Sequence, residues 1–223
     1  MKVVAVSGPS CSGKTTLVKY LHQILPDAHT IFEDDFYLPD SEIPKTNGLE
    51  NWDCPEAFDL AKMAQTLSHA RENGTLPPEH KSIEAANAMG PVRPSPEVVA
   101  RLKDRVQHIK EPVVLVDGIM LFHKSSPVLD EFDHKIVLFT DYATLKQRRE
   151  SRSGYVTIEG FWQDPPGYFD DIVWPEYLKN YGFLYEGEPG TELSKAARQQ
   201  AIVAPPSREL DALLTWAVDL ILE

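Results

Sequence analysis

A cluster of glycines, a lysine and a threonine near the N-terminus has the spacing of a phosphate-binding loop. The pattern G-x-x-x-x-G-K-[ST] is matched by Gly8, Gly13, Lys14 and Thr15. In such a loop the glycines let backbone N–H groups turn towards phosphate oxygens, the lysine reaches the β- and γ-phosphates, and the hydroxyl can ligate Mg²⁺. The residues predicted to bind ATP are Gly8, Pro9, Ser10, Cys11, Ser12, Gly13, Lys14, Thr15 and Thr16.

The context of this loop favours a nucleotide site over a structural turn. An apolar run at 2–7 precedes the loop, and a pattern with helical spacing follows it through Ile24. A strand before the loop and a helix after it are the surroundings that such a motif requires. We interpret Cys11, which lies inside the loop, as a small space-filling residue.

Carboxylates follow two other predicted strands, at the edge where parallel sheets build their sites. Asp117 ends the run 112–117, and Asp34 and Asp35 follow the run 29–32. An acid in the position of Asp117 can hold Mg²⁺ together with Thr15. A carboxylate near the γ-phosphate could orient an acceptor hydroxyl and take its proton. Chemistry alone does not choose between Asp34 and Asp35, and a solvated acidic turn is the alternative.

Arginines gather in the stretch TLKQRRESRSGY at 144–155. Arg148, Arg149 and Arg152 lie on a helical pattern that leaves another predicted strand. On a lone helix such a run is usually a solvated face. In an acidic chain that also carries a phosphate loop, we expect the arginines to surround the charge of a moving phosphoryl group, which planar donors stabilise well.

The stretch NWDCPEAF at 51–58 is ambiguous. Asp53, with a proline two residues later and Glu56 three residues later, makes a good capping box for a helix start. That structural interpretation accounts for Asp53 completely. Trp52 could equally be a core aromatic residue.

The apolar patterns alternate between short runs and helical periods, which predicts an α/β sandwich with a mainly parallel five-stranded sheet covered on both faces. Helices are expected from the phosphate loop to Ile24, from near Pro55 to Gly74, from the serine cap at Ser95 through Ile109, after Asp141, over 169–181 with a kink or restart at Pro175, and over 207–223. The predicted strands are 2–7, 29–32, 112–117, 135–139 and 201–205.

We expect a single domain over residues 1–223, with a lid at about 148–169. The segment 73–96 contains five prolines and no periodicity, so it is predicted to be a surface insertion. It interrupts the alternation without starting a second domain.

Composition excludes several classes of function. The chain has 34 acidic and 22 basic residues and a formal net charge of −12, so nucleic acids and anionic membranes are poor partners. Its two cysteines form no CxxC pair, and no run has the length and apolarity of a secretory signal or a spanning helix. We expect a cytoplasmic or nuclear protein, as a monomer or a weak homodimer.

The order of motifs resembles the nicotinamide riboside kinases, within the uridine kinase-like P-loop kinases. The resemblance covers residues 1–72 and 112–180. The combination of NWD with PGYF and VWP is its most specific part, because phosphate loops are shared by many nucleotide-binding proteins. The segments that carry the resemblance are the phosphate loop, EDDFY, NWDCPEAF, VDGIMLF, RRESR and PGYFDDIVWPEYLK.

The resemblance implies ATP-dependent phosphorylation of the ribose 5′-hydroxyl of nicotinamide riboside, with nicotinic acid riboside as a further candidate acceptor. It implies that Asp34 is the base and that Mg²⁺ is held by Thr15 and Asp117. Lys14, Arg148 and Arg152 would act on the phosphates. The implied substrate ligands are Asp53 and Arg149 for the ribose hydroxyls and Trp52 and Tyr155 for the nicotinamide ring, a cation that aromatic faces attract.

Two alternatives remain at the sequence level. A uridine or cytidine kinase would share the phosphate chemistry but would need hydrogen-bond partners for a neutral pyrimidine. A non-catalytic nucleotide sensor would need neither the acidic edge at 34–35 nor the arginine lid. A guanine-nucleotide switch is disfavoured because the sequence has no NKxD tetrapeptide.

Overall fold

A parallel sheet forms the centre of the computed structural model, which describes residues 1–82, 91–157 and 160–223. The five strands lie in the order β11-β6-β1-β5-β2 and all pair in parallel, which confirms the predicted α/β sandwich. Their bounds are β1 Lys2–Ser7, β2 His29–Phe32, β5 Val113–Gly118, β6 His134–Val137 and β11 Ile202–Val203. Strands 135–139 and 201–205 are thus shorter than predicted.

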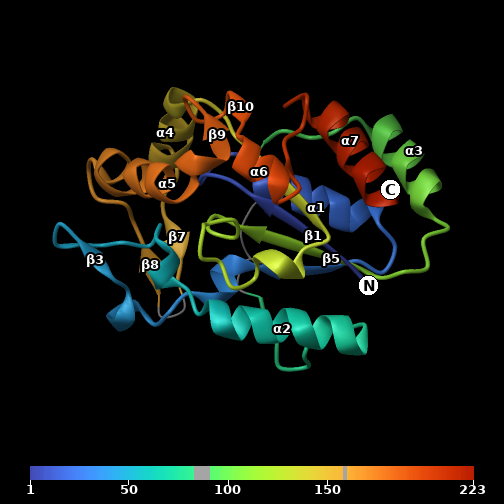
Figure 1. Cartoon of the computed structure of the whole chain (residues 1–223), viewed down its shortest axis with the longest axis horizontal. Helices are drawn as coiled ribbons and strands as arrows, with labels where there is room; N and C mark the ends of the chain where they lie inside the picture. The colour runs from blue at the N-terminus through green and yellow to red at the C-terminus, as the bar shows by residue number, and fades with distance from the viewer. Residues whose placement is uncertain (83–90, 158–159) are drawn as a thin grey trace.

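Helices cover both faces of the sheet. The side chains of β1 alternate between two hydrophobic clusters, with Val3 and Ala5 on one face and Val4 and Val6 on the other. Figure 1 shows α2 below the sheet and α1, α3 and α7 above it. The helix bounds are α1 Lys14–Ile24, α2 Leu60–Asn73, α3 Pro96–Val106, α4 Tyr142–Glu150, α5 Trp174–Tyr181, α6 Lys195–Gln199 and α7 Leu210–Leu222.

Two helix starts differ from the sequence prediction. Pro55–Ala57 forms a 3₁₀ turn, and α2 begins only at Leu60, where the side chain of Asp59 accepts a hydrogen bond from the backbone N–H of Lys62. The capping-box interpretation of Asp53 is therefore wrong, because another acid caps the helix. Ser95 precedes α3 as predicted, but its hydroxyl donates to Asp211 on α7 and caps nothing.

The segment 169–181 contains two kinds of helix. Phe169–Val173 forms a π-helical turn, and α5 begins directly after it with Pro175 in its first turn. Proline is tolerated there because the first N–H groups of a helix have no partner within it. The helix therefore continues past Pro175 without a break, and the expected kink or restart appears as a change of helix type at Trp174.

Short hairpins extend from the sandwich. They are β3 Lys45–Thr46 with β4 Leu49–Glu50, β7 Tyr155–Val156 with β8 Phe161–Trp162, and β9 Tyr185–Glu186 with β10 Glu192–Leu193. The first two lie at the end of the molecule away from α3 and α7 (Figure 1). Residues 83–90 of the predicted insertion and 158–159 of the predicted lid lie outside the described residues.

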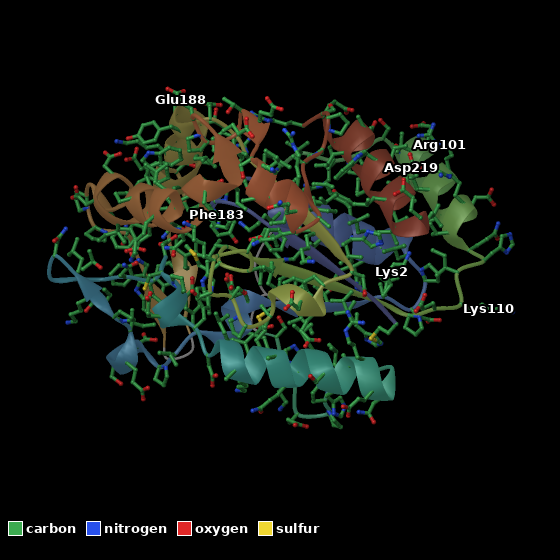
Figure 2. All side chains as sticks on the ribbon, viewed as in Figure 1. Lys2, Arg101, Lys110, Phe183, Glu188 and Asp219 are labelled. Atoms are coloured by element: carbon green, nitrogen blue, oxygen red, sulfur yellow. The ribbon has the colours of Figure 1, made fainter. Side chains whose placement is uncertain are left out.

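At the opposite end of the molecule, exposed polar side chains join α3 to α7. Arg101 and Asp219 project from α3 and α7 there (Figure 2), and Arg105 forms an exposed ion pair with Asp219 at 2.6 Å. Within the described residues, the helices are too short or too polar to cross a membrane.

Candidate active site

The phosphate loop joins β1 to α1 and has a backbone that demands glycine. Gly8 has φ 144°, and a Cβ atom there would lie 2.1 Å from the carbonyl oxygen of Leu138. Gly13, at φ 101°, precedes the first residue of α1. The loop therefore lies against the chain after β6, and the positive end of the α1 dipole faces it.

Lys14 lies buried at the start of α1. Its Nζ atom donates a hydrogen bond to the carbonyl oxygen of Pro9 at 3.0 Å. Burial lowers the pKa of Lys14, and the negative charges of Asp117 and Asp34 oppose that shift. The ammonium group thus lies within electrostatic reach of both predicted site acids.

Asp117 and Thr15 come together as predicted. Burial raises the pKa of Asp117, while the charge of Lys14 and a hydrogen bond with the Thr15 hydroxyl oppose the shift. A carboxylate and a hydroxyl are oxygen ligands, the kind that Mg²⁺ prefers alongside phosphate oxygens and water. The two residues therefore fit a magnesium–nucleotide complex.

A single 3₁₀ turn, Glu33–Phe36, follows β2 and separates the two acids that the sequence could not rank. Asp34 lines the cavity beside Lys14, whereas the side chain of Asp35 turns away and accepts a hydrogen bond from Ser82 at 3.1 Å. Geometry therefore selects Asp34.

Glu33 is a buried acid next to Asp34, behind the cavity, and sequence reasoning missed it. Its Oε2 atom accepts the backbone N–H of Met120 at 2.8 Å. Burial raises the pKa of Glu33 to about 7, although hydrogen bonds from the N–H groups of Met120 and Ile119 lower it. Glu33 precedes Asp34 and Asp35 in a run of three acids, and such a run gives no sequence signal that one of the side chains is buried.

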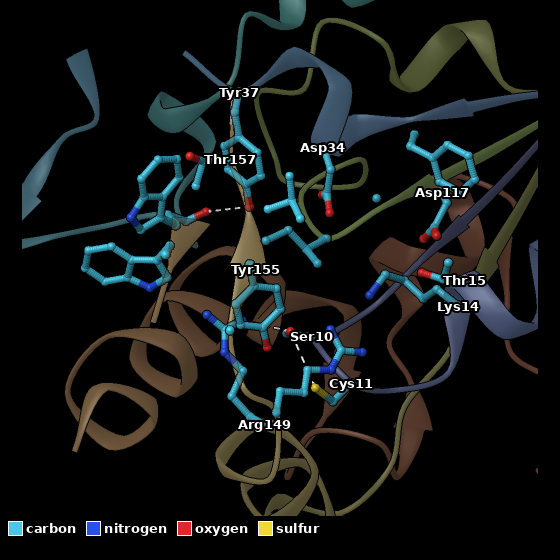
Figure 3. Close-up of a pocket in the computed structure, with 18 of the residues that line it drawn as sticks. Ser10, Cys11, Lys14, Thr15, Asp34, Tyr37, Asp117, Arg149, Tyr155 and Thr157 are labelled. Carbon is cyan, nitrogen blue, oxygen red and sulfur yellow. Dashed lines mark hydrogen bonds between the residues drawn. The ribbon is translucent and has the colours of Figure 1, made fainter. Parts of the chain in front are cut away.

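The cavity has a volume of about 500 Å³. Figure 3 shows Asp34 pointing into the space between Lys14 and Tyr37, with Asp117 and Thr15 at one side. Sequence reasoning did not find Tyr37 or Thr157, which line the other side. Thr157 also joins the lid to the body of the protein, because its hydroxyl donates to Asp40 at 3.1 Å.

Arg149 is the centre of a buried ionic network. Its guanidinium group binds Asp53 through two nitrogens at 3.3 and 3.2 Å and donates to Ser10 at 2.8 Å. It also donates to Asp164 at 2.6 and 3.1 Å. The lid is thereby joined to the phosphate loop. Asp53 pairs with Arg149 and is not among the residues that line the cavity.

Arg148 and Arg152 approach the phosphate loop from the lid. Arg148 donates to the carbonyl oxygen of Cys11 at 3.1 Å, and Arg152 lines the cavity. The structure therefore brings all three predicted arginines to the loop, and Arg149 also pairs with two carboxylates, those of Asp53 and Asp164.

Aromatic rings form the remaining wall. The rings of Trp52 and Trp162 lie 5.7 Å apart, and Tyr37 packs edge-on against Trp52 at 5.3 Å. Tyr155 instead faces guanidinium groups, with its ring centroid 4.4 Å from Cζ of Arg149. Trp162 lies in the predicted lid and lines the cavity, so its position in the sequence could have indicated this aromatic wall.

A second, smaller pocket of about 170 Å³ opens on the other side of the phosphate loop. Ser12 and Arg148 line it, together with Phe139 and Arg208. The Arg208 guanidinium lies 5.8 Å from the centroid of the Phe139 ring. Gly190 closes the pocket, and a Cβ atom there would overlap the Phe139 ring at 1.6 Å.

Comparison with known proteins identifies the family. No protein-family model matches the sequence. The nicotinamide riboside kinase of Schizosaccharomyces pombe is 37% identical over 99% of this chain and 96% of its own length. The chain belongs to the nicotinamide riboside kinase family. The nicotinamide riboside kinase of Eremothecium gossypii is 36% identical over 99% of this chain and 91% of its own length, and human nicotinamide riboside kinase 1 is 32% identical over 79% and 75%.

Among solved structures, one described as a possible uridine kinase from Bacillus stearothermophilus is 16% identical, with a TM-score of 0.48 over 91% of this chain and 87% of that one. A putative fructose transport system kinase from Silicibacter is 25% identical, with a TM-score of 0.44 over 68% and 71%.

Proposed function

We propose that this protein transfers the γ-phosphoryl group of ATP to the ribose 5′-hydroxyl of nicotinamide riboside, giving nicotinamide mononucleotide and ADP. One observation carries this proposal. A single cavity joins Lys14, Asp34 and Asp117 to a wall of aromatic side chains. The family that its relatives define points to the same reaction. Nicotinic acid riboside is a further candidate acceptor.

The aromatic end of the cavity suits a cationic base. Trp52 and Trp162 present ring surface there, and aromatic faces attract a positively charged ring. Nearby carboxylates add to that attraction. Tyr155 must leave its contact with Arg149 before it can stack on the base, so we assign the wall first to the two tryptophans.

The phosphates of ATP lie along the loop from Gly8 to Thr16, and the second pocket is the place for the nucleobase. Phe139 and Arg208 offer flat surfaces for stacking there. Thr15 and Asp117 would hold Mg²⁺ together with the phosphates. When bound, the ion neutralises charge that develops on the transferring oxygens.

Asp34 acts on the acceptor. Its carboxylate orients the 5′-hydroxyl and takes its proton as the oxygen attacks the γ-phosphorus. Lys14 binds the β- and γ-phosphates, and Arg148 and Arg152 stabilise the charge of the moving group from the lid. Closure of the lid also excludes water, which would otherwise accept the phosphoryl group.

Asp53 and Arg149 hold the ribose in this proposal, but in different ways. Arg149 lines the cavity and can turn a donor towards the sugar hydroxyls. Asp53 lies behind it and fixes the guanidinium plane. We expect the enzyme to work in the cytoplasm or nucleus as a monomer or weak homodimer, without nucleic-acid or membrane partners.

The direct test measures ADP release from Mg-ATP with nicotinamide riboside, nicotinic acid riboside, uridine, cytidine or no acceptor. The proposal expects turnover with nicotinamide riboside well above the rate without acceptor. Turnover with uridine or cytidine alone would identify a pyrimidine nucleoside kinase. Slow hydrolysis that no acceptor stimulates would identify a nucleotide sensor.

A further inference from the structure

The turn that carries Asp34 directs its four side chains to four different places. Glu33 enters the protein and binds the backbone after β5, and Phe36 is buried in the core at 2% exposure. Asp35 faces the chain that follows α2. Asp34 faces the cavity. Three side chains of one short turn therefore anchor it and thereby present the fourth.

The anchor for Asp35 comes from the beginning of the proline-rich insertion. The chain leaves α2 at Gly74, whose φ is 71°, and turns again where the N–H of His80 donates to the carbonyl oxygen of Pro77 at 2.9 Å. It then returns to the turn after β2. The insertion thus contacts the turn that carries Asp34, although it is remote from that turn in sequence.

Side chains of Ser82 and His80 join this segment to the turn. The hydroxyl of Ser82 donates to Oδ1 of Asp35 at 3.1 Å, and Nε2 of His80 lies 3.8 Å from Oδ2 of the same carboxylate. The imidazole ring also stacks on Phe36, with centroids 5.9 Å apart and planes 23° apart. The side chains of Asp35 and His80 are 2% and 11% exposed, so water contributes little here.

We propose that His80 and Ser82 are positioning residues for phosphoryl transfer, which hold Asp35 so that the neighbouring Asp34 stays aligned with the acceptor hydroxyl. This inference rests on the proposed function, because it needs Asp34 as the base. Asp34 and Asp35 share one 3₁₀ turn, so a displacement of one carboxylate changes the direction of the other. Transfer is sensitive to such displacements, since an error of about 1 Å can cost on the order of 100-fold in rate.

A purely structural role for the contacts of His80 and Ser82 with Asp35 makes a different prediction. If His80 and Ser82 only stabilised the fold, their substitution would lower the melting temperature and leave kcat unchanged in the folded enzyme. A positioning role lowers kcat and leaves the KM for ATP unchanged, because ATP binds the phosphate loop and the second pocket.

The test uses Ser82→Ala, Ser82→Thr and His80→Ala in the full chain. We expect Ser82→Ala and His80→Ala each to lower kcat with nicotinamide riboside about tenfold, with the KM for ATP within about twofold of wild type. Ser82→Thr keeps the hydroxyl and should restore most of the rate. Lys81→Ala, an exposed neighbour, is the matched control and should match wild type.

A double-mutant cycle tests whether Ser82 affects the rate through Asp34. If His80 and Ser82 act through Asp34, the Ser82→Ala substitution should lower the rate when Asp34 is present. It should have almost no effect on the residual rate of the Asp34→Asn variant. Equal losses in both backgrounds, or a wild-type kcat in Ser82→Ala and His80→Ala, would overturn the inference. Failure of the wild-type enzyme to phosphorylate any nucleoside would instead overturn the proposed function.

Discussion

The edge of the sheet and the lid are held in place by different kinds of contact. At the edge, Asp117 lies in β5, Asp34 is in the turn that follows β2, and Lys14 begins α1 after the phosphate loop. The backbone of the sheet and of α1 therefore fixes these residues. The lid reaches the rest of the site through side chains, chiefly Arg149 with Ser10 and Thr157 with Asp40.

This difference separates two tasks. Lys14, Asp34 and Asp117 belong to the part of the molecule with the most backbone pairing. The groups that enclose the acceptor belong to a part that a few polar contacts hold, as expected of a segment that must open for substrate and product. Substitutions at the edge should therefore change kcat, whereas substitutions of Arg149 and Thr157 in the lid should change acceptor binding.

The largest expected effect is at the edge. Asp34→Asn keeps the size of the side chain but removes the base, so kcat with nicotinamide riboside should fall by about 10²–10⁴. ATP binding, followed by fluorescence or calorimetry, should stay unchanged because the phosphate loop is intact. The matched control is Asp27→Asn, a surface acid outside the site. A kcat near that of wild type in Asp34→Asn would contradict the assignment.

The next effect is in the lid. Arg149→Met leaves Asp53 and Asp164 without their buried partner, which should cost about 3–5 kcal/mol of unfolding free energy. The acceptor KM should rise as well. Arg105→Met, which removes an exposed ion pair with Asp219, should cost at most about 1 kcal/mol. Denaturant unfolding measures both, and similar losses would show that the Arg149 network is no stronger than a surface pair.

A third effect belongs to the edge and depends on pH. The pKa of Glu33 is raised from its ordinary 4.5 to about 7, so the folded protein keeps a proton that the unfolded chain releases between these values. Stability should therefore fall as pH rises from about 4.5 to 7.

Glu33→Gln removes this titration. Its stability relative to wild type should improve over the same interval by up to about 3 kcal/mol. Unfolding free energies at pH 5, 6, 7 and 8 provide the measurement. A difference that does not change with pH would mean that Glu33 is ionised throughout.

The smallest expected effect is at the contact between lid and body. Thr157→Val removes the hydrogen bond to Asp40 while keeping the shape of the side chain, so the acceptor KM should rise about fivefold, or roughly 1 kcal/mol. The kcat should stay near that of wild type. Thr75→Val, an exposed threonine, is the control. A loss confined to kcat would place Thr157 with the catalytic edge instead.

Sequence reasoning predicted which residues meet at this edge of the sheet, because the signals for them are local. The spacing of Gly8, Gly13 and Lys14, and an acid at the end of β5, follow from the geometry of a strand, a loop and a helix. The same reasoning could not separate Asp34 from Asp35, because that choice depends on Ser82, far away in the sequence.

The lid was harder to predict for the same physical reason. Asp164 binds Arg149, a residue of α4 that lies 15 positions earlier in the chain. Asp53 looked like a helix cap because its local pattern allows one, yet a buried arginine pairs with it instead. The second pocket depends on Gly190 and Arg208, whose segments have no recognisable motif.

The position of the transferred phosphate tests the central claim most directly. The enzyme would be incubated with Mg-ATP and either nicotinamide riboside or its 5′-deoxy analogue, and the products followed by phosphorus and proton NMR. We predict a phosphomonoester coupled to the C5′ protons with the riboside and no ADP above background with the analogue. Inorganic phosphate as the main product, or equal ADP release with both compounds, would contradict transfer to the 5′-hydroxyl.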